Sequence, residues 1–124
     1  MGDTGATQVA EAFIERKRLR RGNARTDGQV YYLFGKPIAR HGAGTPDLVH
    51  ALLRDEKPPV MLTWAGWPTQ STARHLNAVC RAAGRRPRAQ LMQSNKVKTA
   101  LWRSGHNDDY YPADTLQWFD IRHI

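Results

Sequence analysis

The stretch that decides the fold is Gly66-Trp67-Pro68-Thr69-Gln70-Ser71-Thr72-Ala73-Arg74-His75-Leu76-Asn77-Ala78. Val60–Trp64, just before it, carries no charge and predicts a buried central strand. Glycine and proline then indicate a tight corner, after which Thr69 or Ser71 is expected to cap a helix. Apolar positions of that helix recur at helical spacing, at Ala73, Leu76, Val79, Cys80 and Ala83, and Gly84 is expected to end it. The stretch therefore predicts a strand, a corner and a helix, and it contains no catalytic motif.

On the N-terminal side, the pattern predicts a helix followed by a hairpin. Thr7 to about Arg21 is amphipathic and is expected to form a helix that Gly22-Asn23 ends. Residues 29–34 are rich in β-branched and aromatic side chains and predict a strand, with residues 38–40 returning beside it. The first six residues are expected to be disordered.

On the C-terminal side, residues 88–93 and 96–103 predict a second hairpin around Ser94-Asn95. Residues 104–113 are expected to form a polar loop, and residues 116–121 a final strand. Residues 42–59 are interpreted as an insertion with one short helix, since a threonine, a proline and an aspartate open it. The expected fold is a single α+β domain over residues 1–124: a mostly antiparallel sheet packed against two main helices.

The charge balance favours polyanionic partners. Among 124 residues, 19 are Lys or Arg and 11 are acidic, which gives a net charge of +8, and most of the cations are arginines. Arginine binds phosphate and carboxylate groups with a planar fork of donors. A high-GC genome, which enriches arginine everywhere, is the alternative explanation. The single cysteine excludes an intramolecular disulfide, and no apolar run is long enough to span a membrane, so a soluble cytoplasmic protein without a membrane partner is expected.

Two groups of cations are candidate binding sites. The first basic cluster comprises Arg16, Lys17, Arg18, Arg20, Arg21 and Arg25. On the expected helix these side chains form a ridge that could follow a phosphate backbone, although cations at a helix end also complement its dipole. The second basic cluster, where the dipole explanation is stronger, comprises Arg81, Arg85, Arg86 and Arg88.

The aromatic residues divide into core and candidate contact residues. Strand positions suggest a core role for Tyr32, Phe34, Trp64 and Trp118. Trp67 is expected to pack against the following helix rather than to stack on a base. Tyr110 and Tyr111, in the expected polar loop, are candidates for stacking on unpaired bases or for anchoring a protein interface.

An enzymatic function is a third alternative. His106, Asp108 and Asp109 lie together, and Asp120 and His123 lie three residues apart, so these groups could hold a divalent metal for phosphodiester hydrolysis. Their spacing matches no metal signature, and Asn-Asp-Asp is also ordinary turn chemistry. Cys80 lies on the apolar side of its helix and is interpreted as a core residue. No cofactor is expected.

Several short motifs together resemble a family of proteins. These are Gly22-Asn23, Leu33-Phe34-Gly35 with Ile38-Ala39, then Gly66-Trp67-Pro68-Thr69, Leu76-Asn77-Ala78 and a tryptophan near the end, Trp118. The discontinuous pattern is similar to small accessory proteins of tailed bacteriophages and prophages. It departs from them at His75, where an arginine is usual, and in residues 42–59. The resemblance implies a small phage protein directed at nucleic-acid machinery and carries no catalytic residue.

The expected function is therefore non-enzymatic binding, through an arginine-rich surface, to nucleic acid or to a complex that handles nucleic acid. The alternative is a phage inhibitor of a host enzyme or defence system that acts by protein–protein binding. A metal-dependent nuclease is a third possibility.

Overall fold

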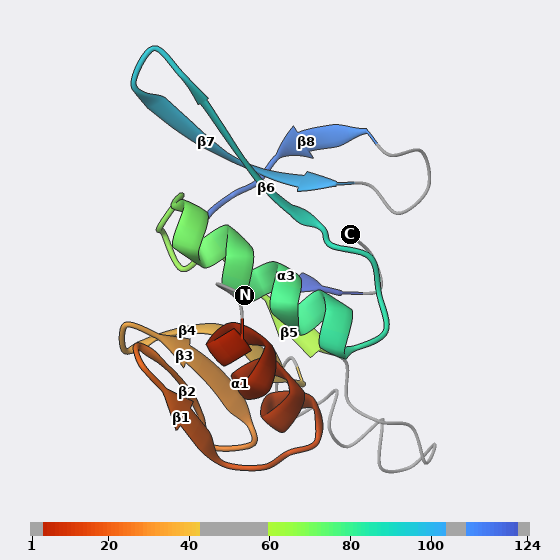
Figure 1. The fold of residues 1–124 in the computed structure, drawn as a ribbon. Coiled ribbons are helices and arrows are strands. Elements are labelled where there is room, and N and C mark those ends of the chain that lie inside the picture. Colours follow the sequence, from red (N-terminus) through yellow and green to blue (C-terminus); the bar gives the residue numbers. More distant parts are fainter. Residues whose placement is uncertain (1–3, 43–59, 104–108, 122–124) are drawn as a thin grey trace.

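The computed structural model describes residues 4–42, 60–103 and 109–121, which form two helices and two antiparallel sheets (Figure 1). The expected α+β class is confirmed. One sheet has the strand order β1-β2-β3-β4-β5-β9 and the other β6-β7-β8. The elements are α1 Thr4–Ile14, β1 Leu19–Arg21, β2 Ala24–Thr26, β3 Val30–Leu33, β4 Lys36–His41, β5 Val60–Leu62, α3 Gln70–Ala82, β6 Ala89–Ser94, β7 Val97–Arg103, β8 Tyr110–Pro112 and β9 Phe119–Asp120.

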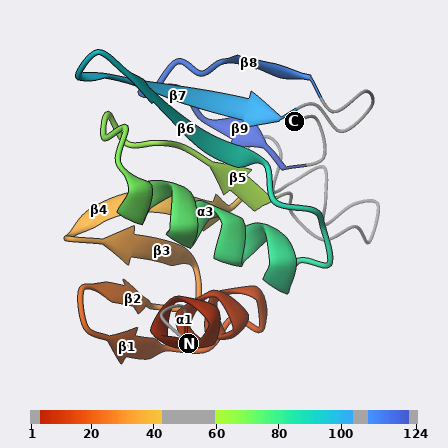
Figure 2. The ribbon, with the colours of Figure 1, turned by 45° about the horizontal axis from the view of Figure 1, so that its top comes forward.

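Both helices lie on the same face of the six-stranded sheet (Figure 2). Alternation along β3 sends Tyr31 and Leu33 inward, where both are buried, while Tyr32 points to the opposite face. Phe13 of α1 packs edge-on against Tyr31, with ring centroids 6.2 Å apart. The other face carries neither α1 nor α3, so within the described ranges it is free of helices.

The three-stranded sheet joins the core through tryptophans. Trp102 of β7 is fully buried between Trp64 and Phe119, at centroid distances of 5.9 and 5.5 Å. Asn77 of α3 supplies the second link, because its side-chain amide both donates to the Ala89 carbonyl (2.9 Å) and accepts from the Ala89 amide (2.8 Å). The Leu-Asn motif of the sequence is thus explained by attachment of α3 to the first residue of β6.

The corner and the second main helix follow the prediction. Thr69 is the N-cap, and its hydroxyl accepts from the Thr72 amide at 3.1 Å. Gly84 follows the helix with φ of +75°, which suits a helix end. The hairpins β3–β4 and β6–β7 are confirmed as well, the second turning at Asn95-Lys96 rather than at Ser94-Asn95.

The predicted helix over residues 7–21 is wrong at both ends. The helix begins at Thr4, although residues 1–6 were expected to be disordered, and it ends at Ile14. Lys17 donates its amide to the Ala12 carbonyl and Arg16 to that of Phe13, with Arg16 at φ of +60°. These are the two bonds of a Schellman motif, in which arginine occupies the position usually taken by glycine.

The prediction that these cations form a ridge on one helix is therefore also wrong. Residues 19–21 form strand β1 instead, and Gly22-Asn23 is the turn of the hairpin β1–β2, not the end of a helix. The hairpin is favoured over a longer helix because Leu19 and Thr26, which pair directly, add their side chains to the face that the helices cover.

Two further expectations require correction. Tyr110 and Tyr111 lie in strand β8 rather than in a loop. The final strand is only Phe119–Asp120, while Leu116 lies in the preceding turn and is 77 % exposed. The inserted short helix expected within residues 42–59 lies outside the described residues, apart from Gly42. Neither described helix has the length and hydropathy needed to cross a bilayer.

Candidate nucleic-acid interface

The face of the six-stranded sheet that α1 and α3 leave open carries arginines and aromatic rings. Arg20 of β1 pairs directly with Arg25 of β2, which in turn pairs with Tyr32 of β3. Directly paired residues of antiparallel strands point to the same face, so these three side chains form one row. Arg40 of β4 lies on this face too, in the next row, opposite Val30. We call Arg20, Arg25, Tyr32, Arg40 and the adjoining Trp118 the basic–aromatic face.

Two of these arginines, Arg25 and Arg40, lie over aromatic rings. The guanidinium carbon of Arg25 lies 4.1 Å from the centroid of Tyr32, and that of Arg40 lies 4.4 Å from the centroid of Trp118. A stacked guanidinium still presents its N–H groups at its edge, where an anion can approach. The Arg40 Nε is buried and has no hydrogen-bond partner among the described residues. A buried donor without a partner is rare in proteins, and an oxygen atom of a bound ligand would supply the missing acceptor.

The members of the first basic cluster have different environments. Arg20 and Arg25 lie on the basic–aromatic face. Arg21 points to the other face, where its guanidinium donates to Gln8 (3.1 Å) and to the carbonyl of Arg20 (2.8 Å). Arg16 donates to the Gln29 side chain at 3.2 Å, and Lys17 forms an exposed ion pair with Glu15 at 3.2 Å. Only part of the cluster thus contributes to one surface.

The second basic cluster lies elsewhere. Arg81 is in the last turn of α3, and the chain from there to β6 carries the other three members. Figures 1 and 2 place this segment away from the hairpin β1–β2. Arg85 and Arg86 are exposed, but Arg88 is only 8 % exposed, so the expectation of four surface cations holds for three.

The sequence assigned several residues of this interface to other roles. Tyr32 and Trp118 were expected in the core, yet both are half-buried beneath arginines. Phe34 was expected in the core too, but it is 48 % exposed in the turn between β3 and β4. The alternation of Arg25, Tyr32 and Arg40 with buried neighbours is the signal that predicts them, but only once the β1–β2 hairpin is known.

Trp67 lies against this turn. Its ring is half-buried and tilted on Phe34, with centroids 5.9 Å apart, and the Lys36 ammonium lies 4.2 Å above it. Trp67 is therefore a packing residue of the β3–β4 turn, and its predicted contact with the following helix stays a prediction.

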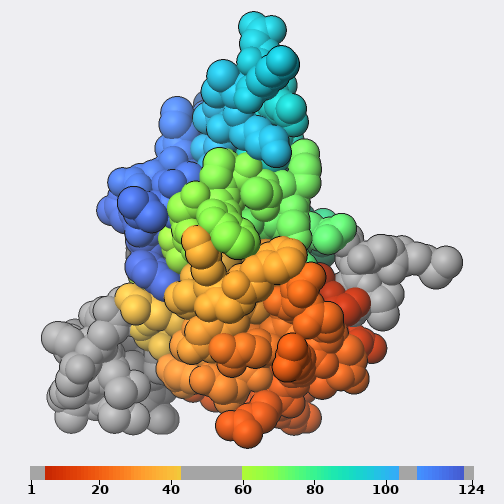
Figure 3. All heavy atoms as spheres, turned by 90° about the vertical axis from the view of Figure 1, so that its left-hand side faces the viewer, coloured from red at the N-terminus to blue at the C-terminus, as the bar shows by residue number. Residues whose placement is uncertain are grey.

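The outer side of the three-stranded sheet carries apolar side chains among polar ones. Met92, Val97, Leu101, Tyr110 and Pro112 share one side by strand alternation and pairing, and we call them the apolar face. Val97 is 63 % exposed and Met92 51 %. Figure 3 shows the end of the β6–β7 hairpin projecting beyond the rest of the described chain. Tyr111 points to the opposite side, beside Trp102, and partial burial raises the pKa of its hydroxyl.

The described part of the chain contains no group of three or more His, Cys, Asp or Glu side chains that could hold a metal ion. His106, Asp108 and His123 lie outside that part. Cys80 is a core residue as predicted, and burial raises the pKa of its thiol to about 11, so the reactive thiolate is scarce at neutral pH.

Charge is distributed unevenly along the chain. Residues 60–103 contain eight Lys and Arg and no acidic residue.

Comparison with known proteins adds no constraint on the function, since no protein-family model, no curated protein and no solved structure matches this chain.

Proposed function

We propose that the protein binds single-stranded nucleic acid through the basic–aromatic face. The observation that carries this proposal is the row Arg20–Arg25–Tyr32, in which two arginines lie directly opposite each other beside an aromatic ring. Like charges in this position destabilise a sheet, by roughly 0.2–1 kcal/mol. Their presence therefore favours a polyanion as the natural partner.

The chemistry of the face fits an unpaired strand. Phosphates can bind the edges of the stacked guanidinium groups, and bases can stack on the arginine planes and on exposed aromatic rings. A groove of duplex DNA admits one helix or a two-stranded ribbon, whereas a sheet of six strands is too wide to enter it. An open strand can instead lie across the sheet.

The charges at the margin of the face limit where the strand can lie. Arg40 pairs with Met61, and Met61 pairs with Asp120 of the edge strand β9. An acid at this end repels phosphate, so the strand is expected to run along β1–β4. A phage accessory role, which the resemblance implies, remains a prediction.

The proposal is tested with labelled single-stranded and duplex oligonucleotides of one sequence, by fluorescence anisotropy. With three arginines on phosphates, the affinity for the single strand should fall about twentyfold between about 50 and 200 mM salt. Duplex should bind more weakly at every salt concentration. An affinity that does not change with salt, or a preference for duplex, would contradict the proposal.

Paired charge reversals locate the site. Arg20→Glu with Arg25→Glu should abolish binding of the single strand, because phosphate attraction becomes repulsion. Arg85→Glu with Arg86→Glu makes the same change of net charge in the exposed second basic cluster and serves as the matched control. Equal losses in the two double variants would mean that net charge alone drives binding and that the face is not the site.

One observation favours the alternative of a protein-directed inhibitor. The apolar face is exposed, and Tyr110 and Met92 on it are side chains typical of protein interfaces. In this case a host protein should be captured from lysate after nuclease treatment. Met92→Ser with Tyr110→Ser should abolish that capture, whereas Arg20→Glu with Arg25→Glu should retain it.

A further inference from the structure

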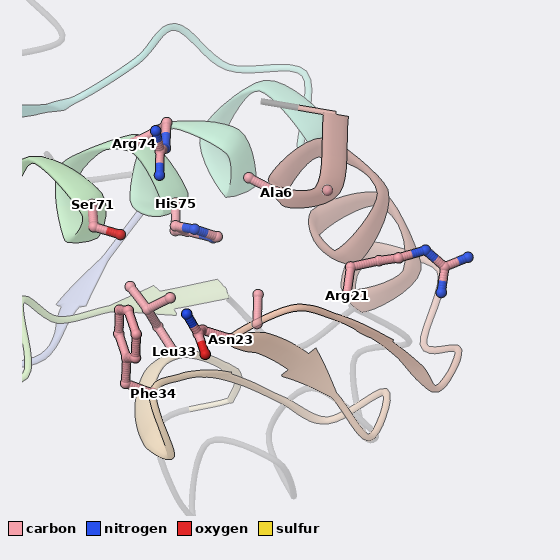
Figure 4. Close-up of a pocket in the computed structure, with 10 residues that line it drawn as sticks. Ala6, Arg21, Asn23, Leu33, Phe34, Ser71, Arg74 and His75 are labelled. Carbon is pink, nitrogen blue, oxygen red and sulfur yellow. The ribbon is translucent and has the colours of Figure 1, made fainter. Parts of the chain in front are cut away.

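A cleft lies where the first turns of α1 and α3 meet the turn-side ends of β2 and β3. Its volume is about 260 Å³, close to the smallest cavities that hold small ligands. Figure 4 shows Ser71 and His75 of α3 on one side and Asn23, Leu33 and Phe34 on the other. This cleft is separate from the basic–aromatic face, although Phe34 lies at the boundary between them.

The cleft is electropositive. Among the residues that the structure describes, the charged side chains that line it are Arg21 and Arg74, and none of the lining residues is acidic. Arg21 contributes mainly its stem, because its guanidinium donates to Gln8 and to the Arg20 carbonyl. Arg74 also lies near enough to Tyr31 for its charge to oppose the effect of burial on the pKa of that hydroxyl. The first turn of α3, which contains Ser71, carries no acidic side chain.

His75 is fixed in orientation by a buried hydrogen bond. Its Nδ1 bonds to the hydroxyl of Tyr31, and Figure 4 shows its ring directed into the space between the helices and β2. Burial raises the pKa of Tyr31 well above its usual value, so the hydroxyl keeps its proton and can donate it to Nδ1. When the hydroxyl donates to Nδ1, the neutral ring carries its proton on Nε2. The lining thus includes the Ser71 hydroxyl, the His75 imidazole and Arg74 on the side of α3, and the Asn23 amide on the side of the strands.

Phe34 gives the cleft an aromatic margin. Its backbone has φ of +51°, which is costly for a bulky side chain, and its ring is nevertheless 48 % exposed. Strain of this kind persists where the surroundings enforce it, and it concentrates at ligand sites. Trp67, tilted against the ring, holds it in place.

We propose that this cleft binds a phosphomonoester of nucleotide size, with the phosphate near Ser71, Arg74 and His75 and the base against Phe34. Such a group occurs in a free nucleotide and at the phosphorylated end of a nucleic-acid strand. The proposal goes beyond binding at the basic–aromatic face and does not depend on it.

Calorimetric titration of the full chain with AMP, adenosine and inorganic phosphate tests the site. AMP should bind more tightly than either part alone. Arg74→Gln should weaken AMP about tenfold, through loss of one charge-assisted hydrogen bond. Arg81→Gln removes the same charge from an exposed position on the same helix and should change the affinity less than about twofold. Equal binding of AMP and adenosine, or equal effects of the two variants, would overturn the proposal.

Oligonucleotides distinguish the two sources of the phosphate. A single strand with a 5′-phosphate, one with a 3′-phosphate and one with neither are compared in the Arg20→Glu, Arg25→Glu background, where the basic–aromatic face is disabled. A preference for either phosphorylated end that Arg74→Gln removes assigns the site to strand ends. AMP binding without any such preference assigns it to free nucleotides. If neither AMP nor a phosphorylated end binds, the cleft is not a phosphate site, whatever the outcome at the sheet.

Discussion

Backbone conformation at a few single residues decides where this chain turns. Arg16, Phe34, Ala65, Asn95 and Lys96 all have positive φ, yet only asparagine adopts this conformation readily. At Arg16 the conformation ends α1, and at Phe34 it closes the β3–β4 hairpin together with Gly35. The side chains at these positions give little sign of such turns, so sequence patterns alone misplace them.

The backbone around Gly28 leaves no room for a side chain. Its φ is +94°, and a Cβ added there would lie 2.7 Å from the carbonyl oxygen of Arg16. We predict that Gly28→Ala lowers the free energy of unfolding by about 2–5 kcal/mol, from strain plus the backbone clash. Gly35→Ala is the control, because its φ is +78° but nothing lies within 4 Å of the added atom. Urea unfolding of both variants should show the smaller loss for Gly35→Ala.

Substitutions of Phe34 should separate the cost of its backbone strain from its contribution to ligand binding. We predict that Phe34→Asn is more stable than Phe34→Ala by about 1 kcal/mol, because asparagine tolerates positive φ and alanine does not. Both variants remove the ring that meets Trp67 and lines the cleft, so both should weaken AMP binding. Chemical unfolding and calorimetry measure the two effects separately. Unchanged AMP affinity in both would remove Phe34 from the proposed site.

At the scale of elements, the end of α1 is fixed by contacts with distant segments. His41, the last residue of β4, bonds through Nε2 to the Phe13 carbonyl at 2.7 Å and stacks on the Phe13 ring at 4.3 Å. The turn at Asp27-Gly28 approaches the Arg16 carbonyl. Helix propensity would allow α1 to continue, but these contacts and the β1–β2 pairing favour its end at Ile14.

The burial of His41 should make stability depend on pH. Burial lowers the pKa of His41 below its usual value of 6.5, the hydrogen bond to the Phe13 carbonyl opposes this shift, and the nearby charge of Arg16 adds to it. The unfolded state therefore binds the proton more readily, and stability falls as pH drops from the unfolded pKa towards the folded one. We predict that His41→Gln flattens the decline in unfolding free energy between about pH 7 and pH 5.5. Parallel curves for wild type and variant would contradict this.

Asn77 should be the main connection between α3 and the second sheet. We predict that Asn77→Ala costs about 2–4 kcal/mol, since it leaves both the amide and the carbonyl of Ala89 without their partner. Gln90→Ala is the control, because Gln90 is exposed and its bond to the Leu91 carbonyl is long, at 3.5 Å. Thermal unfolding of the two variants measures the difference. A loss below about 0.5 kcal/mol for Asn77→Ala would show that water satisfies Ala89.

At the scale of the whole molecule, excess positive charge opposes compactness and favours an anionic partner. The net charge is +8, and eight cations without an acid lie in residues 60–103. Like charges that the fold places side by side, as at Arg20 and Arg25, add to this self-repulsion.

Reversal of one charge should separate stability from binding. We predict that Arg20→Glu stabilises the fold by a few tenths to about 1 kcal/mol, because the new carboxylate lies opposite Arg25. The same change should weaken binding of the single strand, because the face loses a phosphate contact. Urea unfolding and anisotropy are compared with those of Arg20→Gln, which removes the charge without reversing it. A variant that gains stability and keeps full affinity would show that Arg20 has no binding role.

The sequence by itself determined the elements whose signals are local. Alternation and turn chemistry predicted β3–β4 and β6–β7, an uncharged run predicted β5, and a threonine cap with a 3.6-residue period predicted α3, since each depends on residues close together in the chain. The tertiary structure decided where α1 ends, which of the first basic cluster share a face, and that Arg74, His75 and Phe34 line one cleft. These outcomes depend on strand pairing and on packing between segments far apart in sequence, and such long-range contacts outweigh a helix propensity of only a few tenths of a kcal/mol per residue.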